Sequence, residues 1–116
     1  AFVDPEQILV WNPEILFVDE GGLQLLLDDL KNNSEYETIK AIEEGKVYGV
    51  LPYNYYTANY GTILANSYYI GKILYPERFS DVDIGEKTDE IYEELVGEGV
   101  YDEMSETFGV FKKIDI

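Results

Sequence analysis

The chain contains no cysteine and no histidine. Their absence excludes a thiolate nucleophile, a cysteine–histidine dyad, a serine–histidine triad and most transition-metal sites. An enzyme built from this sequence would rely on Asp, Glu, Tyr, Lys or Ser alone, and no spacing singles out any of them. We therefore expect a protein that is not an enzyme, with no cofactor and no metal site.

Basic residues are scarce, with 8 Lys and Arg against 24 Asp and Glu, and the formal net charge is −16. Such a surface repels phosphate backbones and anionic lipid heads, so nucleic-acid binding is not expected. An acidic surface favours solubility, and it also attracts cations or basic partner surfaces.

Long apolar runs are missing as well. No stretch approaches the roughly 20 apolar residues of a membrane span, and no basic-then-apolar signal segment opens the chain. The first residues are "AFVDPEQ", without a methionine. We expect an excised piece or a processed product, so a missing signal says little about where the parent protein resides.

What the chain does have is apolar and aromatic residues, 46% and 15% of the total, which favours a packed core in at most one domain. The patterns of apolar residues, caps and breakers predict helices and strands in alternation, the order of an α/β layer. Five helices are expected: one that starts at Asp4, one over 23–33, one from a Ser34–Glu37 capping box to Gly45, one from an Asn59 cap to Tyr75, and one over about 86–96. The expected strands cover 13–18 and 46–51. The chain is expected to end in a short strand or an extended tail.

Two strands and a tail make a thin sheet, because typical sheets have about 4–6 strands. We therefore expect residues 1–116 to form a single partial domain. Its fold class would be α/β, a partial three-layer lobe with a short, mostly parallel sheet flanked by helices.

Two segments look like ligand sites but have simpler interpretations. "DVDIGEKTDE" (81–90) superficially echoes a calcium loop, yet Gly85 falls one place early and the closing glutamate is missing, so an exposed helix entrance is favoured. "GG" at 21–22 lacks a phosphate-binding pattern and is expected to be a plain strand-to-helix turn.

The stronger signal is the tyrosine-rich segment "PYNYYTANY", which follows the strand predicted at 46–51. Ligand crevices in α/β sheets open at the carboxyl ends of strands, and tyrosine offers both an apolar face and a hydroxyl group. Tyr53, Tyr55 and Tyr56 are therefore candidates for ligand contact or for plain packing. Tyr68, Tyr69 and Tyr75 lie on the following helix and are expected to pack.

Three collinear blocks carry a resemblance to a known family: "DPEQILVWNPEILFVDEG", "IKAIEEGKVYGVLPYNYY" and "ILANSYYIGKILYPERF". They resemble the C-terminal lobe of the substrate-binding proteins of ABC importers for iron complexes, haem and vitamin B12, over about residues 3–98. The tail is similar to tails of archaeal members. These proteins belong to the periplasmic binding proteins in which a rigid linker helix joins two α/β lobes.

The resemblance implies the function and the site residues. The parent would capture an iron complex (a siderophore or haem) or a corrinoid and deliver it to the membrane permease, from outside the cytoplasm or as a surface lipoprotein. Tyr53, Asn54, Tyr55 and Tyr56 would line the ligand cleft. Glu6, in the "EQ" pair, would dock on the permease. The loop after the predicted strand lacks arginine, which weakens the case for a strongly anionic chelate.

Two alternatives stay open. One is a cytosolic metal-cluster enzyme subunit with the same lobe architecture, although the missing cysteines and histidines count against it. The other is a stand-alone acidic interaction domain. Because exposed sheet edges invite strand pairing, we expect this fragment to self-associate.

Overall fold

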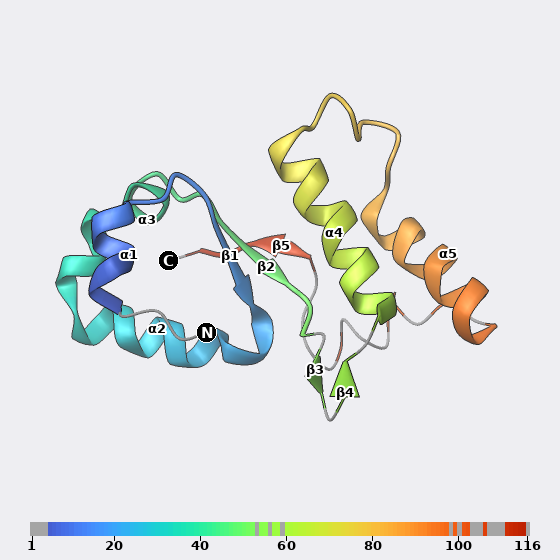
Figure 1. Ribbon diagram of the computed structural model, residues 1–116, viewed down its shortest axis with the longest axis horizontal. Helices are drawn as coiled ribbons and strands as arrows, with labels where there is room; N and C mark the ends of the chain where they lie inside the picture. Colours follow the sequence, from blue (N-terminus) through green and yellow to red (C-terminus); the bar gives the residue numbers. More distant parts are fainter. Residues whose placement is uncertain are drawn as a thin grey trace. The chain divides into compact units, whose positions relative to one another are not determined.

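The structure is a computed structural model that describes residues 5–52, 54, 55, 57, 58, 60–97, 99, 101, 102, 106 and 111–115. The chain divides into two compact units. Ala1–Gly49 and Lys112–Ile116 form what we call the sheet unit, and Val50–Phe111 form the helical unit. Figure 1 shows the elements of each.

The sheet unit has a small three-stranded sheet in the order β1-β2-β5, accompanied by helices (Figure 1). The expected mixed α/β class is confirmed. Strand β5 runs antiparallel to β2, with Tyr48 opposite Lys113 and Gly49 opposite Lys112, so the sheet is not parallel throughout. The elements of this unit are α1 (Pro5–Trp11), β1 (Leu16–Asp19), the 3-10 turn η1 (Glu20–Gly22), α2 (Leu23–Asn32), the 3-10 turn η2 (Ser34–Thr38), α3 (Lys40–Glu43), β2 (Val47–Val50, whose last residue belongs to the helical unit) and β5 (Lys112–Lys113).

The helix expected from Ser34 to Gly45 is wrong in its first half. Ile39 is extended, with φ −65° and ψ 127°, and separates η2 from α3. Ile39 is buried in the core of the unit, and the helix restarts at Lys40. The amide of Lys40 is capped by the Asn12 side-chain oxygen at 2.8 Å, so the cap comes from a residue far away in sequence.

Asn12 itself ends α1. Its backbone is left-handed (φ 45°), a conformation that asparagine tolerates better than most residues. Its amide donates to the carbonyl of Ile8 at 3.0 Å, and the carbonyl of Pro13 accepts from the amide of Ala41. Asn12 and Pro13 therefore end α1 and also accept hydrogen bonds from the first residues of α3. Gly45 also has a positive φ (71°), as expected for the residue that closes α3.

The helical unit consists of a two-stranded hairpin followed by two long helices that lie side by side (Figure 1). Its elements are β3 (Asn54–Tyr55), β4 (Thr57–Ala58), α4 (Tyr60–Leu74) and α5 (Ile84–Val96). The side chain of Asp83 caps α5 by accepting from the amide of Glu86, and Gly97 closes it with φ 85°. The interpretation of 81–90 as a helix entrance is confirmed. In the described part of the chain, no helix is long and apolar enough to cross a membrane.

Each unit has its own apolar core. The most buried apolar side chains of the sheet unit are Leu30, Ile39, Ala41, Val47 and Ile114, and those of the helical unit are Leu51, Ala65, Tyr69, Tyr92 and Phe111.

Candidate functional site

The tyrosine-rich segment forms a hairpin between β2 and α4. Strand β3 pairs antiparallel with β4, Asn54 opposite Ala58 and Tyr55 opposite Thr57. Tyr53 and Tyr56 lie outside the described residues, as do the side chains of Asn54 and Tyr55. Their role in ligand contact therefore stays a prediction, while the segment that carries them is a short hairpin.

The root of this hairpin is fixed by one buried amide side chain. Asn66 of α4 accepts from the backbone N–H of Leu51 at 3.0 Å and donates to the backbone carbonyl of Leu51 at 2.8 Å. Leu51 is fully buried, so water does not satisfy these backbone groups. The two hydrogen bonds tie the residue that precedes Pro52 to α4, and they limit where the hairpin begins.

The helix behind the hairpin is held by close contacts with α5. Thr62 and the hydroxyl of Tyr92 form a buried hydrogen bond of 2.5 Å. At Gly61 an added Cβ would lie 2.9 Å from Cζ of Tyr92, so only glycine permits this approach. The ammonium of Lys72 donates to the carbonyl of Val82 and fastens the loop between the two helices.

The helix tyrosines divide into two groups. Tyr69 is buried with its ring centroid 4.7 Å from that of Phe111, and Tyr68 packs edge-on against Phe79 at 6.3 Å. For these two the packing role is confirmed. Tyr75, by contrast, is 59% exposed, so its expected packing role is wrong: the helix ends at Leu74, and Tyr75 lies beyond it.

Tyr60 is an aromatic residue whose position the sequence analysis missed. It begins α4 directly after the hairpin and is 74% exposed. The signal was available, because a residue at the first turn of a helix that leaves a ligand loop is adjacent to that loop. Tyr60 therefore joins Tyr53, Tyr55 and Tyr56 as a candidate contact residue.

Glu6, the residue expected to dock on a permease, lies in the first turn of α1 and is exposed. The sheet unit thus presents this carboxylate at its surface. Docking itself stays a prediction.

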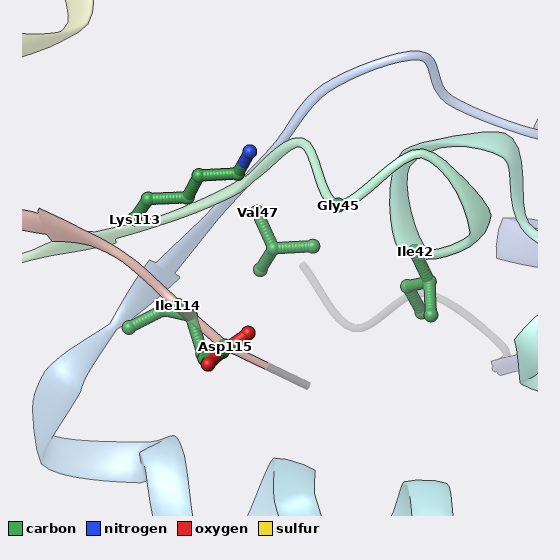
Figure 2. Close-up of a pocket in the computed structure, with 6 residues that line it drawn as sticks. All are labelled: Ile42, Gly45, Val47, Lys113, Ile114 and Asp115. Atoms are coloured by element: carbon green, nitrogen blue, oxygen red, sulfur yellow. The ribbon is translucent and has the colours of Figure 1, made fainter.

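The sheet unit contains hollows between its helices and its sheet. The first, of about 320 Å³, lies between the end of α3 and the edge formed by β2 and β5. In Figure 2, Ile42 and Val47 reach into this space, while the Lys113 side chain extends beside the strand toward Gly45. A larger one, of about 480 Å³, is mainly apolar and is lined by residues of α1, β1, α2 and α3, among them Ile8, Val18, Leu26 and Ile42.

One carboxylate of the sheet unit is chemically unusual. Both side-chain oxygens of Glu20 are buried and accept no hydrogen bond from the described residues. Burial raises the pKa of Glu20 from 4.5 to about 7, with Lys112 opposing this rise and Asp19 adding to it. Nothing in the sequence distinguishes Glu20 from the other acidic residues of this very acidic chain.

Within the described residues no group of three or more acidic side chains is placed to hold a metal ion. Asp83 is occupied as a helix cap. Gly21 and Gly22 belong to the turn η1, where the amide of Gly21 donates to the Asp19 carboxylate, so the plain-turn interpretation is confirmed.

No protein-family model matches this chain. A molybdate-binding protein does. The chain is 26% identical to the molybdate-binding protein MolA of Haemophilus influenzae over 98 residues, which are 80% of this chain and 27% of that protein.

The chain thus spans about a quarter of the length of the curated relative it matches. The chain is a distant relative of a solute-binding protein, which agrees with the expected likeness to solute-binding proteins in general. The relative is named for molybdate, not for an iron complex, haem or vitamin B12. The narrower resemblance to that group therefore stays a prediction.

Proposed function

We propose that this chain is part of the solute-binding component of an ABC importer, with the β3–β4 hairpin forming one wall of the ligand cleft. The observation that carries the proposal is the likeness to a solute-binding protein over 98 residues, a stretch long enough to cover most of both units. The protein would perform no chemistry. It would capture its ligand between two lobes and release it to the permease.

The arrangement of the helical unit supports this assignment. The hairpin follows β2 without a long linker, its root is held by Asn66, and exposed Tyr60 stands directly after it. A rigid base with aromatic and amide groups on a short loop suits ligand recognition, because few side-chain rotamers need to be frozen on binding.

The ligand we propose is a small metal-containing solute. An iron complex (siderophore or haem) or a corrinoid follows from the family resemblance, and molybdate follows from the relative. These ligands differ in size and charge. The hairpin offers hydroxyl, amide and backbone donors but no arginine, so an anion would be held by neutral donors on this side.

Binding to the full-length protein tests the proposal. We would titrate it by calorimetry with molybdate, a ferric siderophore, haem and cobalamin, and then repeat with Tyr55→Ala, Tyr56→Ala and Tyr60→Ala. We expect one ligand to bind and the hairpin changes to weaken it about tenfold or more, since loss of a stacking aromatic costs roughly 1–1.5 kcal/mol. Tyr75→Ala is the matched control, because Tyr75, like Tyr60, is exposed but lies past the other end of α4.

Two results count against the proposal. If none of the four ligands binds, the solute is of another class or the chain is not a binding lobe. If one binds and all hairpin variants bind it as tightly as Tyr75→Ala, the hairpin is not a cleft wall.

Permease docking through Glu6 is a separate part of the proposal. An acidic residue in the first turn of an exposed helix is well placed to meet a permease arginine. Glu6→Lys should abolish uptake by cells without changing ligand affinity, whereas Glu35→Lys, an equal charge change at another exposed site of the sheet unit, should not. Uptake unaffected by Glu6→Lys would remove this residue from the docking surface. Such a route also places the protein outside the cytoplasm.

We further propose that the isolated chain self-associates. Large apolar side chains are exposed on both units: Val10, Trp11 and Leu25 on the sheet unit, and Tyr60, Leu64 and Leu95 on the helical unit. Apolar side chains of this size favour burial, either in a longer parent or against a second copy. Sedimentation at micromolar concentration should give a mass above 13.3 kDa, and a monomeric mass would refute this point.

A further inference from the structure

The carboxylate of Glu20 lies directly on the sheet where β2 carries a glycine. A Cβ added to Gly49 would fall 2.2 Å from Oε1 of Glu20 and 2.9 Å from its Cδ. The glycine therefore makes room for the carboxylate, which covers the strand in place of a side chain. We call this space over Gly49, which the Glu20 carboxylate occupies, the seat of Glu20. Any side chain at position 49 would fill it.

The seat is also next to the C-terminal strand. Gly49 is the pairing partner of Lys112 in the β2–β5 ladder, and the amide of Ile114 donates to the carbonyl of Val47 at 2.7 Å. Strand β5 consists of two residues only, so its attachment depends on very few hydrogen bonds. The pairing of Gly49 with Lys112 is one of the two ladder positions between β2 and β5.

None of the described groups around Glu20 donates a hydrogen bond to its carboxylate. Asp19, at the end of β1, is another acid, and its carboxylate accepts from the amide of Gly21 at 2.8 Å. Lys112 of β5 is the cation whose charge acts on Glu20, but it is exposed and beyond ion-pair distance. Strand β2 contributes the glycine at this place. Burial without hydrogen-bond partners favours the neutral form of this carboxyl.

We propose that Glu20 is a proton-operated clasp for the C-terminal strand: protonated, it lies buried over Gly49 and lets β5 pair with β2, and ionised, it leaves this seat and loosens β5. The inference concerns the sheet unit alone and does not rest on the proposed function. Its consequence is a protein whose C-terminal segment is held more firmly in mildly acidic than in mildly alkaline surroundings.

The position of the titration supports this device. Burial raises the pKa of Glu20 to about 7, against 4.5 for a carboxyl free in water. Between pH 6 and pH 8 the seated carboxyl would pass from mostly neutral to mostly ionised. By linkage, opening of the strand would become about tenfold more favourable over that range.

Hydrogen exchange at the amide of Ile114 reads the clasp directly, because that amide bonds across the β2–β5 pair. In the full-length protein we expect its protection factor, corrected for the intrinsic pH effect, to fall about tenfold from pH 6 to pH 8. The amide of Leu51, held by Asn66 in the helical unit, should show no such fall. Glu20→Gln, neutral at every pH, should remove the pH dependence, and Glu35→Gln, the same change at an exposed site, should preserve it.

A second readout covers the case in which Glu20→Gln fails to fold. The carboxyl carbon of Glu20 can be followed by NMR in the unmodified protein and in Lys112→Met. We expect a midpoint near 7 in the former and a higher one in the latter, where the favourable charge is gone. A midpoint below 5, or an Ile114 protection factor that is the same at pH 6 and pH 8, would overturn the proposal.

Discussion

The two units treat buried polar groups in opposite ways. Among the described residues of the helical unit, the buried polar side chains have partners: Asn66 with the backbone of Leu51, Thr62 with Tyr92, and Thr88 with the carbonyl of Ile84. In the sheet unit Glu20 has two buried oxygens with none among the described residues.

Close packing in the helical unit is concentrated where its glycines meet aromatic rings. Glycines of α4 let these rings approach to van der Waals distance, as at Gly61 with Tyr92 and at Gly71 with Phe79. Both units contain hollows elsewhere: the sheet unit has hollows of about 320 and 480 Å³ beside its sheet, and the helical unit has one of about 300 Å³ past the end of α4. The units therefore differ in how their buried polar groups are satisfied and not in whether they contain hollows.

The largest effect on stability is expected from Asn66→Ala. The change leaves the N–H and the carbonyl of Leu51 buried without partners, which should cost about 3 kcal/mol in the free energy of unfolding. Urea denaturation would measure it. Ser67→Ala, which removes an exposed hydroxyl one residue away, is the control and should change the midpoint little.

If Asn66→Ala lowered the free energy of unfolding no more than Ser67→Ala, the two hydrogen bonds between Asn66 and Leu51 would not be needed for stability. The contrast between a satisfied helical unit and an unsatisfied sheet unit would then lose its energetic meaning.

The next effect is steric, at Gly61. A Cβ there would meet the ring of Tyr92 at 2.9–3.0 Å, and the ring is held by its bond to Thr62. Gly61→Ala should therefore destabilise the helical unit by about 1–3 kcal/mol, more than alanine returns in helix propensity. Thermal unfolding would report the change.

Gly22→Ala is the matched control for that prediction, since an added Cβ there meets nothing within 4 Å. Equal melting temperatures for the two variants would show that the α4–α5 contact yields to a methyl group.

How much of this was visible in the sequence depends on whether the deciding contact was local. The helix entrance within 81–90 was predicted correctly, because its cap, Asp83, acts on residues within one turn. The helix over 23–33 was also predicted, because its leucines recur at helical spacing: Leu30 is buried, while Leu25, on another face, is 74% exposed. The ends of β1 and β2 were located to within a few residues.

The contacts that sequence reasoning missed join distant residues. Ser34 and Glu37 formed an apparent capping box, yet Asn12, 28 residues before Lys40, provides the cap of α3. Nothing local to Glu20 indicates that it lies on Gly49. In the candidate site, the tyrosine pattern indicated where the hairpin lies, but the amide of Asn66 that fixes its root was not among the predicted residues.

A third prediction concerns the pH dependence of the sheet unit as a whole. The pKa of Glu20 is raised in the folded state, so the folded protein binds more protons than the unfolded chain between pH 4.5 and about 7. Stability contributed by Glu20 is therefore full below pH 4.5 and falls as pH rises to about 7. The full shift corresponds to about 3 kcal/mol. Because Glu20 is only partly buried, we expect the loss to be smaller, about 1–2 kcal/mol.

Urea midpoints at pH 5 and pH 8 would measure this loss, with Glu20→Gln as the comparison. The difference between the two pH values should shrink in the variant by the stated amount. A variant with the same pH difference as the unmodified chain would assign the dependence to other carboxylates.

The smallest effect on stability is expected from Gly49→Ala, and it tests the seat rather than the charge. The new methyl group would occupy the place of the Glu20 carboxylate, which can swing away because it is the end of a flexible side chain. Position 49 has no left-handed backbone, so alanine fits the strand. We expect a change below about 1 kcal/mol at pH 6, because burial lost by one side chain is offset by a better strand residue.

The decisive measurement is how Gly49→Ala changes the response to pH. With its seat filled, Glu20 returns to solvent, and urea midpoints at pH 5 and pH 8 should differ no more than they do in Glu20→Gln. If Gly49→Ala kept the full pH difference, the carboxylate would owe its neutral form to something other than its place over the glycine. Glu20 would then no longer distinguish the sheet unit from the helical unit as a site with an unsatisfied buried polar group.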